Sequence, residues 1–160
     1  MSDPRNPYRP PGAAVDDVAP PAGAPVKAVV YGVLVDVGGS IVAGIVLAIA
    51  YSIDLASSGA TAEEIEQAMR EPDPGSWFSI LGFVAGFAAS FLGGYVCARV
   101  ARTGELRAVG VVAAISAVIG LLMGSAAYAF EWNALLALAG MATVFAGGWF
   151  GTRANRRRTT

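Results

Sequence analysis

Four long apolar stretches constrain the fold of this chain more than any other feature of its sequence. They cover about residues 28–51, 77–99, 108–130 and 132–152, and Asp36 is the only charged residue well inside any of them. At about 1.5 Å per residue, each stretch is long enough as a helix to cross a hydrocarbon core about 30 Å thick. Because lipid offers backbone groups no hydrogen-bond partner, such segments must be helices. The sequence therefore predicts an all-α, four-helix transmembrane bundle.

A cleaved signal peptide is the alternative interpretation of the first stretch. Ala48-Ile49-Ala50 has the small-x-small form of a cleavage site. The apolar region of a signal peptide, however, is about 7–15 residues long and follows a short basic segment. This stretch exceeds twenty residues and follows a long, charge-balanced tail. It is therefore predicted to remain as a membrane helix.

The eleven Lys and Arg residues predict the orientation of the helices. Only Arg70 lies between the first and second stretches. The other ten precede the first stretch, join the second to the third, or follow the fourth: Arg5, Arg9, Lys27, Arg99, Arg102, Arg107, Arg153, Arg156, Arg157 and Arg158. Basic residues collect on the cytoplasmic side of a membrane. We therefore expect a multi-pass protein, typical of small bacterial inner-membrane proteins, with both termini in the cytoplasm.

Both ends of the chain are predicted to be cytoplasmic tails. Residues 1–26 hold seven of the nine prolines and few large apolar side chains, so they bury too little surface to offset the entropy of ordering. A disordered tail is expected; docking of the P-x-x-P sequence at 7–10 in a partner's groove is the alternative. Residues 153–160 form a basic tail. The predicted headgroup anchors are Arg99, Arg102, Arg153, Arg156, Arg157 and Arg158.

The outer loop, residues 54–76, is acidic and contains a capping signal. Thr61-Ala62-Glu63-Glu64 has the form of a capping box, and Pro72 ends the element, which predicts a short helix near 62–71. Its apolar residues Ile65, Ala68 and Met69 share one face, which we expect to lie at the lipid interface or over the outer end of the bundle. A solvated loop is favoured over an acidic cation site.

A repeat divides the chain into two tandem helical hairpins, residues 27–102 and 103–152. The ends of the second and fourth stretches both read Gly-Gly-aromatic-apolar-small-small-Arg-x-x-Arg, beginning at Gly93 and Gly147. The starts of the first and third also match, since Lys27-Ala28-Val29 corresponds to Arg107-Ala108-Val109. Each half crosses the membrane twice, so the halves are predicted to share one orientation.

Small residues recur at every fourth position and so share one helix face in each stretch. Close backbone approach and interhelical hydrogen bonds hold membrane helices together, so these glycine-zipper ladders are predicted to be packing seams. The same chemistry would serve association with a second copy or with a partner membrane protein. The seam residues are Gly32, Gly44, Gly82, Gly86, Ser90, Gly94, Gly120, Gly124, Gly147 and Gly151.

Asp36 is the costly residue of the first stretch. A central ionised Asp costs about 2.5–3.5 kcal/mol on insertion scales, and such groups usually face a bundle interior or water. No other stretch carries a basic residue in its core. We therefore expect a protonated Asp36 that donates to a hydroxyl or a backbone carbonyl. The candidate hydroxyls are those of Ser40, Ser90, Ser116 and Thr143.

The residue inventory bounds the function. The chain has no His and a single Cys, Cys97, which removes zinc sites and Cys/His nucleophiles within one chain. The net charge of −1 gives no reason to expect a nucleic-acid partner. We expect no enzyme activity, cofactor or metal. The favoured function is a structural or accessory membrane protein that assembles through its small-residue faces; the alternative is a small proton- or cation-coupled transporter or channel that uses Asp36 and Ser40.

Overall fold

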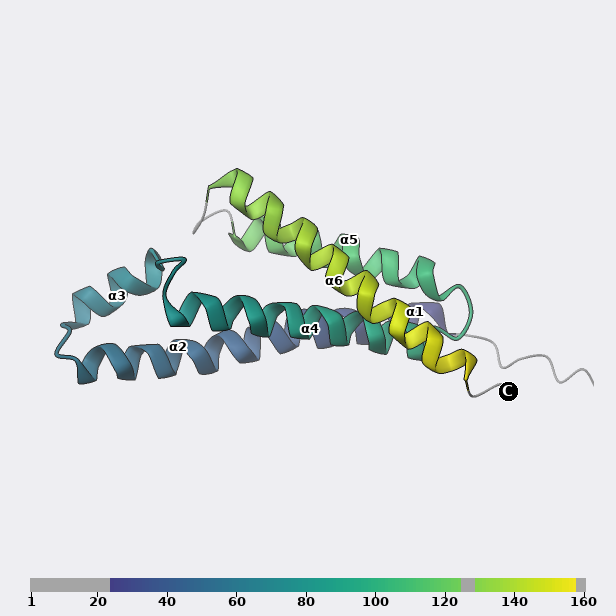
Figure 1. Ribbon diagram of the computed structural model, residues 1–160, viewed down its shortest axis with the longest axis horizontal. Coiled ribbons are helices and arrows are strands. Elements are labelled where there is room, and N and C mark those ends of the chain that lie inside the picture. The colour runs from purple at the N-terminus through teal and green to yellow at the C-terminus, as the bar shows by residue number, and fades with distance from the viewer. Residues whose placement is uncertain (1–23, 125–128, 158–160) are drawn as a thin grey trace, which may run out of the picture.

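The computed structural model describes residues 24–124 and 129–157, and these residues form helices and no strand (Figure 1). Four of the helical segments are long and apolar enough to cross a membrane. The all-α prediction is therefore confirmed, as is the presence of four helices that could span a membrane. The predicted N-terminal tail, apart from its last three residues, lies outside the described residues, as does Arg158.

The first long helix runs without a break through α1 (Pro25–Val33), η1 (Leu34–Gly38) and α2 (Gly39–Ser57). It begins earlier than the sequence predicts because Pro25 suits the first helical turn, where its missing N–H costs no hydrogen bond. It also continues past residue 51, since Ser52 and Asp54 are helical although polar. η1 is a π turn, which the sequence analysis does not anticipate.

A short helix and the second long helix follow. In α3 (Ala62–Arg70) the predicted capping box is present: the Thr61 hydroxyl accepts from the Glu64 N–H, and the Glu64 carboxylate accepts from the Thr61 N–H. The half-buried positions of α3 include Ile65 and Met69. In α4 (Trp77–Ala101) the Ser76 hydroxyl caps the first turn.

The last two long helices are α5 (Glu105–Gly124) and α6 (Phe130–Arg156). α5 begins three residues before the predicted start at 108, and the predicted end of that stretch falls partly on residues 125–128, outside the described residues. α6 extends into the predicted basic tail, because Arg153 and Arg156 sit favourably in its last turn, at the negative end of the helix dipole.

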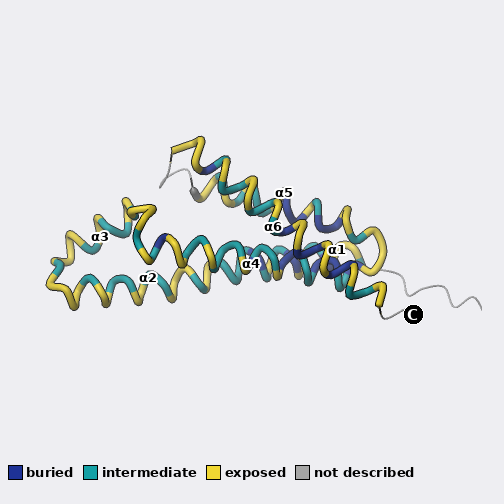
Figure 2. The backbone as a smooth tube through the Cα atoms, in the orientation of Figure 1, coloured by how far each residue is buried: buried dark blue, intermediate teal, exposed yellow. Residues whose placement is uncertain are grey.

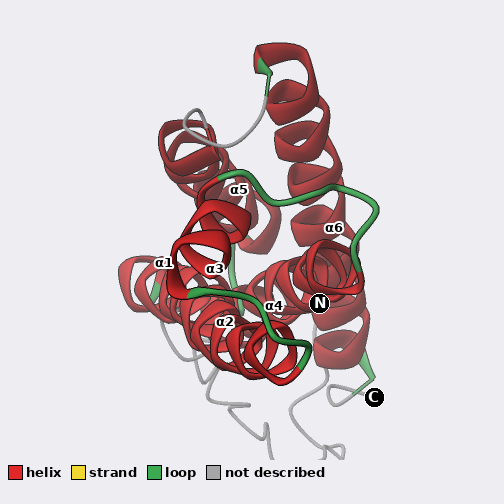
Figure 3. Cartoon of the chain, turned by 90° about the vertical axis from the view of Figure 1, so that its left-hand side faces the viewer, coloured by secondary structure: helices red, strands yellow, loops and turns green. Residues whose placement is uncertain are grey.

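The long helices converge at one end of the molecule and diverge at the other. α2 and α4 run side by side. α6 crosses α4 near its own C-terminal end, where α5 packs on α1 and α4, and α5 and α6 then separate from α2 and α4 toward α3 (Figures 1 and 3). Figure 2 shows that the buried residues gather at this converging end. The core there consists mainly of small side chains: Ala28, Cys97, Ala98, Ala101, Ala108, Val109, Val112, Ala113 and Val144.

Glycine contacts between α4 and α6 explain the tight crossing at the converging end. A Cβ on Gly94 would overlap the backbone carbonyl of Val144, and a Cβ on Gly147 would overlap the carbonyl of Phe91. A Cβ on Gly151 would lie 2.7 Å from a carbonyl oxygen of α4. The two repeated Gly-Gly segments therefore lie against each other with their backbones in direct contact.

Candidate functional site

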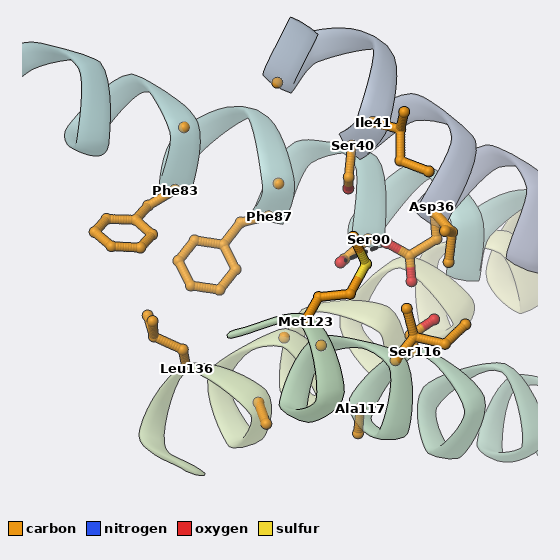
Figure 4. A pocket seen from close by; sticks show the side chains of 18 of the residues that line it. Asp36, Ser40, Ile41, Phe83, Phe87, Ser90, Ser116, Ala117, Met123 and Leu136 are labelled. Atoms are coloured by element: carbon orange, nitrogen blue, oxygen red, sulfur yellow. Dashed lines mark hydrogen bonds between the residues drawn. The ribbon is translucent and has the colours of Figure 1, made fainter. Parts of the chain in front are cut away.

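A cavity of about 660 Å³ lies where the helices diverge. It is lined by residues of η1, α2, α4, α5 and α6, and it runs from Asp36 toward Ala48 along α2 and from Ser90 toward Gly82 along α4. The cavity thus extends from the converged core toward the end where α3 lies. Figure 4 shows its inner part, with Asp36, Ser90 and Ser116 gathered there.

Asp36 is the buried acid of this cavity. It lies in the π turn, is only 3% exposed, and accepts a 2.7 Å hydrogen bond on Oδ1 from the Ser90 hydroxyl of α4. Ser90 is one of the four expected hydroxyl partners, and in this bond the hydroxyl donates and the carboxyl accepts. Asp36 Oδ2 has no hydrogen-bond partner among the described residues. Half of this carboxyl group is therefore buried and unpaired.

The other candidate hydroxyls lie in different surroundings. Ser116 Oγ of α5 is buried and has no hydrogen-bond partner within the described part of the chain. Ser40 lines the cavity one turn beyond Asp36. Thr143 does not line the cavity, and its hydroxyl donates to the carbonyl of Ala139 in its own helix. The structure thus brings Ser40, Ser90 and Ser116 together with Asp36 and leaves Thr143 aside.

Ser90 places this group near the middle of its helix. It lies about 20 Å from the Trp77 end of α4 and about 17 Å from the Ala101 end, at about 1.5 Å per residue. In a membrane that α4 crosses along its whole length, Asp36, which bonds Ser90, would lie near the middle, where water is scarcest. A polar group left unpaired at such a depth costs free energy unless a ligand, a proton or water completes its bonding.

The π turn keeps Asp36 and the small residues that follow it on the same side. Residues four apart in an α-helix shift by about 40° around the axis, because a turn holds 3.6 residues. A π turn has i→i+5 bonds and more residues per turn, so it offsets this drift. Ser40, Gly44 and Ala48 accordingly line the same cavity as Asp36. Gly38 and Gly39, which follow the acid, have low helix propensity and so tolerate such a departure from α-helix.

The predicted seam residues divide into two groups. Gly94, Gly147 and Gly151 pack backbone to backbone between α4 and α6, and Gly32 packs closely on Cys97 and Val112. Gly44, Gly82, Gly86 and Gly120 line the cavity, and a Cβ built on any of them would meet nothing within 4 Å. Gly124 ends α5, and its surroundings lie outside the described residues.

Two polar residues have tertiary roles that the sequence does not signal, the buried Asn133 and the half-buried Asn155. Asn133 of α6 is 6% exposed and lines the cavity; it escaped notice because it stands at the predicted end of a span. Asn155 donates from Nδ2 to the Ala98 carbonyl (2.9 Å) and to Glu105 Oε1 (2.6 Å), which ties α4, α5 and α6 together at the converging end. Its place in a predicted tail gave no signal of that role.

The predicted arginine anchors lie at the converging end. The Arg153 guanidinium lies 3.9 Å from the centre of the Trp149 ring, and that of Arg99 lies 5.9 Å from the Tyr95 ring. These two pairs occupy matching positions in the repeated segments. The other described anchors are Arg102, which follows α4 with a φ of 54°, and Arg156 and Arg157 at the end of α6.

The chemistry open to the cavity is narrow. Its polar lining consists of Asp36, Ser40, Ser90, Ser116 and Asn133, and apolar side chains and glycines form the rest. No basic side chain lines it, and the described residues hold no group of three His, Cys, Asp or Glu side chains suited to a metal. The site can therefore hold a proton or one cationic group.

Comparison of the chain with protein-family models, with curated proteins and with solved structures finds no match.

Proposed function

We propose that this protein is a non-enzymatic membrane transporter that exchanges protons for a small molecule at Asp36. It lies in the bacterial inner membrane with both termini in the cytoplasm. The observation that carries the proposal is the buried Asp36 carboxyl, with one oxygen unpaired, at the inner end of a cavity of about 660 Å³.

Two further features favour transport over a purely structural role. Several glycines that would serve association are already used within one chain, between α4 and α6. The cavity also supplies the polar groups that a path through the membrane needs, from Ser90 and Ser116 beside Asp36 to Asn133 farther along α6. A membrane protein that only packs against a partner has little use for an open cavity with an unpaired acid.

The mechanism follows from the two ends of the molecule. In this state the helices diverge at the end that carries α3, and the glycine contacts of α4 and α6 close the other end. Transport requires a second state in which the open and closed ends exchange. Asp36 biases the two states because the charged carboxylate needs a cation or water, whereas the protonated carboxyl tolerates an apolar enclosure.

Cysteine accessibility tests this proposal without a known substrate. The variant Ser40→Cys, with Cys97→Ala to remove the native thiol, places one thiol in the cavity wall. We expect a membrane-impermeant thiol reagent to label it from the outer side in one state and from the cytoplasmic side in the other, with proportions that change with pH. Adding Asp36→Asn keeps hydrogen bonding but removes titration, so the pH dependence should disappear.

A thiol at Ser58, beyond the end of α2, serves as the matched control. Ser58 is exposed and lies outside the cavity, so Ser58→Cys should be labelled from one side only, at a rate set by the reagent's own chemistry. If Ser40→Cys, like Ser58→Cys, is labelled from one side only at every pH, the transport proposal fails.

Assembly with another membrane helix is the second candidate function. It is supported by Gly44, Gly82, Gly86 and Gly120, which present bare faces to the cavity. The variant Gly86→Leu separates the two candidates. An accessory protein that receives a helix there would lose its complex, measured as mass in detergent, while a transporter that works as a single chain would keep its mass and lose access to the Ser40→Cys thiol.

A further inference from the structure

We infer that the ligand of this cavity is a small apolar amine whose ammonium group pairs with Asp36 and whose apolar body lies between α4 and α6. The inference rests on the proposed function and names the class of molecule that the site would carry. It combines a buried acid with one unpaired oxygen, an unpaired hydroxyl near it, and an apolar volume of limited size.

The polar end of the cavity selects an N–H cation. Asp36 Oδ1 is occupied by the Ser90 hydroxyl, while Oδ2 and Ser116 Oγ have no partner within the described chain. Figure 4 shows the side chains of Asp36 and Ser116 near each other at the inner end of the cavity. A primary ammonium group has three donors and can serve both oxygens, whereas a quaternary ammonium group has none. Pairing also removes the cost of an unpartnered carboxylate at this depth.

The rest of the cavity selects an apolar body. Phe83 and Phe87 of α4 face the cavity, with Leu136 of α6 opposite and Met123 of α5 beside them. An inorganic cation would want five or more oxygen ligands and would leave this apolar wall unused. Bare glycines such as Gly82 and Gly86 leave flat surfaces on which a ring or alkyl chain can lie.

The volume of the cavity suits a small molecule. Sites for small molecules usually measure about 300–1,000 Å³, and this cavity measures about 660 Å³. A single-ring amine therefore fits the space as it stands.

Equilibrium binding with two matched probes tests this inference on the full chain in lipid nanodiscs. The probes are 2-phenylethylamine, held below its pKa so that it is charged, and 2-phenylethanol, which has the same ring and no charge. A charged hydrogen bond in a buried site is worth about 1.5–3 kcal/mol, so we expect the amine to bind about 10- to 150-fold more tightly. Equal binding of the two probes would overturn the inference.

Three variants show whether the preference arises at the proposed residues. Asp36→Asn should abolish the preference for the amine, and Ser116→Ala, which keeps the acid, should reduce it several-fold. Phe83→Ala should weaken both probes by the same factor. Thr143→Val serves as the matched control, because Thr143 bonds its own helix and lies outside the cavity, so both probes should bind it as they bind the wild type.

The result can be separated from that of the labelling experiment. If the amine binds through Asp36 but Ser40→Cys is reached from one side only, the ligand class stands and the transport mechanism fails. If access alternates with pH while the two probes bind equally, the mechanism stands and the inferred ligand class is wrong. The ligand class is also wrong if an N-trimethylated phenylethylamine binds as tightly as the primary amine.

Discussion

Single residues with the same identity have different roles along the α4 ladder. Gly94 allows α4 and α6 to touch, whereas Gly82, three turns away on the same ladder, faces open space. Sequence spacing alone cannot distinguish these two roles, because Gly82 and Gly94 both belong to the series of small residues at every fourth position. The difference depends on where the helices diverge, which is a property of the tertiary structure.

This pair gives a direct stability prediction. Gly94→Ala forces its Cβ into the Val144 carbonyl and should lower the free energy of unfolding by about 1–3 kcal/mol, as overpacking does. Gly82→Ala adds the same methyl group to open space and should change the free energy by less than about 0.5 kcal/mol. Denaturation with SDS from mixed micelles measures both values, and equal effects would contradict the division of the ladder.

Asp36 could be singled out from the sequence, because it is the only charged residue well inside an apolar stretch. From the sequence, the hydrogen-bond partner of Asp36 could be restricted only to four candidate hydroxyl groups. Ser90 was selected by the way η1 packs on α4, where a Cβ on Gly93 would lie 2.7 Å from the Asp36 Cβ. Likewise, the unpaired oxygens of Asp36 and Ser116 could be identified only once the positions of three helices were known.

At the level of elements, α3 is the helix that the sequence specified most completely. Its capping box was legible as four adjacent residues, and both of its hydrogen bonds are formed. The hydrogen bonds from the Thr61 backbone and side chain lower the pKa of Glu64 below its ordinary value. The ionised carboxylate is thus the form that helps to hold the first turn of α3.

The stability of α3 should therefore depend on pH with a definite sign. Because the pKa of Glu64 is lower in the folded state, its contribution is complete above the ordinary value of 4.5 and is lost as the pH falls through the lowered folded value. Backbone Cα chemical shifts of Ala62–Arg70 should move toward coil values over that acidic range. Glu64→Gln keeps a capping side chain without titration, so its shifts should lack this component; identical profiles would refute the assignment.

The π turn was the element least accessible to sequence analysis. Apolar residues surround it, so no change in hydropathy marks it. Gly-Gly pairs also occur where helices only pack, as at Gly93-Gly94 and Gly147-Gly148. What fixes it is a tertiary contact. Asp36 must face α4 to bond Ser90, while Ser40 and Gly44 must stay on the cavity side. A single turn with more residues satisfies both demands.

For the whole molecule, charge segregation predicts that the chain ends lie on the side opposite α3. In a Cys97→Ala background, Thr160→Cys should be protected from an impermeant maleimide in intact cells and become reactive after lysis, while Ser58→Cys should react in intact cells. Labelling of Thr160→Cys in intact cells would contradict the predicted orientation. Lipid attraction to the arginines near the converging end is the physical reason for the expected result.

The number and type of the long helices could be predicted from apolar length, because a membrane leaves the backbone no other option. Helix ends were less certain: Pro25, Glu105 and Arg156 are helical although they lie outside the apolar stretches. The cavity could not be predicted, since helix periodicity says which face packs and not how far two pairs of helices diverge. That divergence turned half of the predicted seam into a cavity wall.

Infrared titration of isotope-labelled aspartate in the full chain tests the central claim, that Asp36 titrates inside the cavity. Subtracting the spectra of Asp36→Asn isolates its carboxyl group from the acids of the outer loop. The account predicts a protonated carboxyl band that disappears as the pH rises, over the same range in which labelling of Ser40→Cys changes sides. A difference band that stays constant across that range would contradict it.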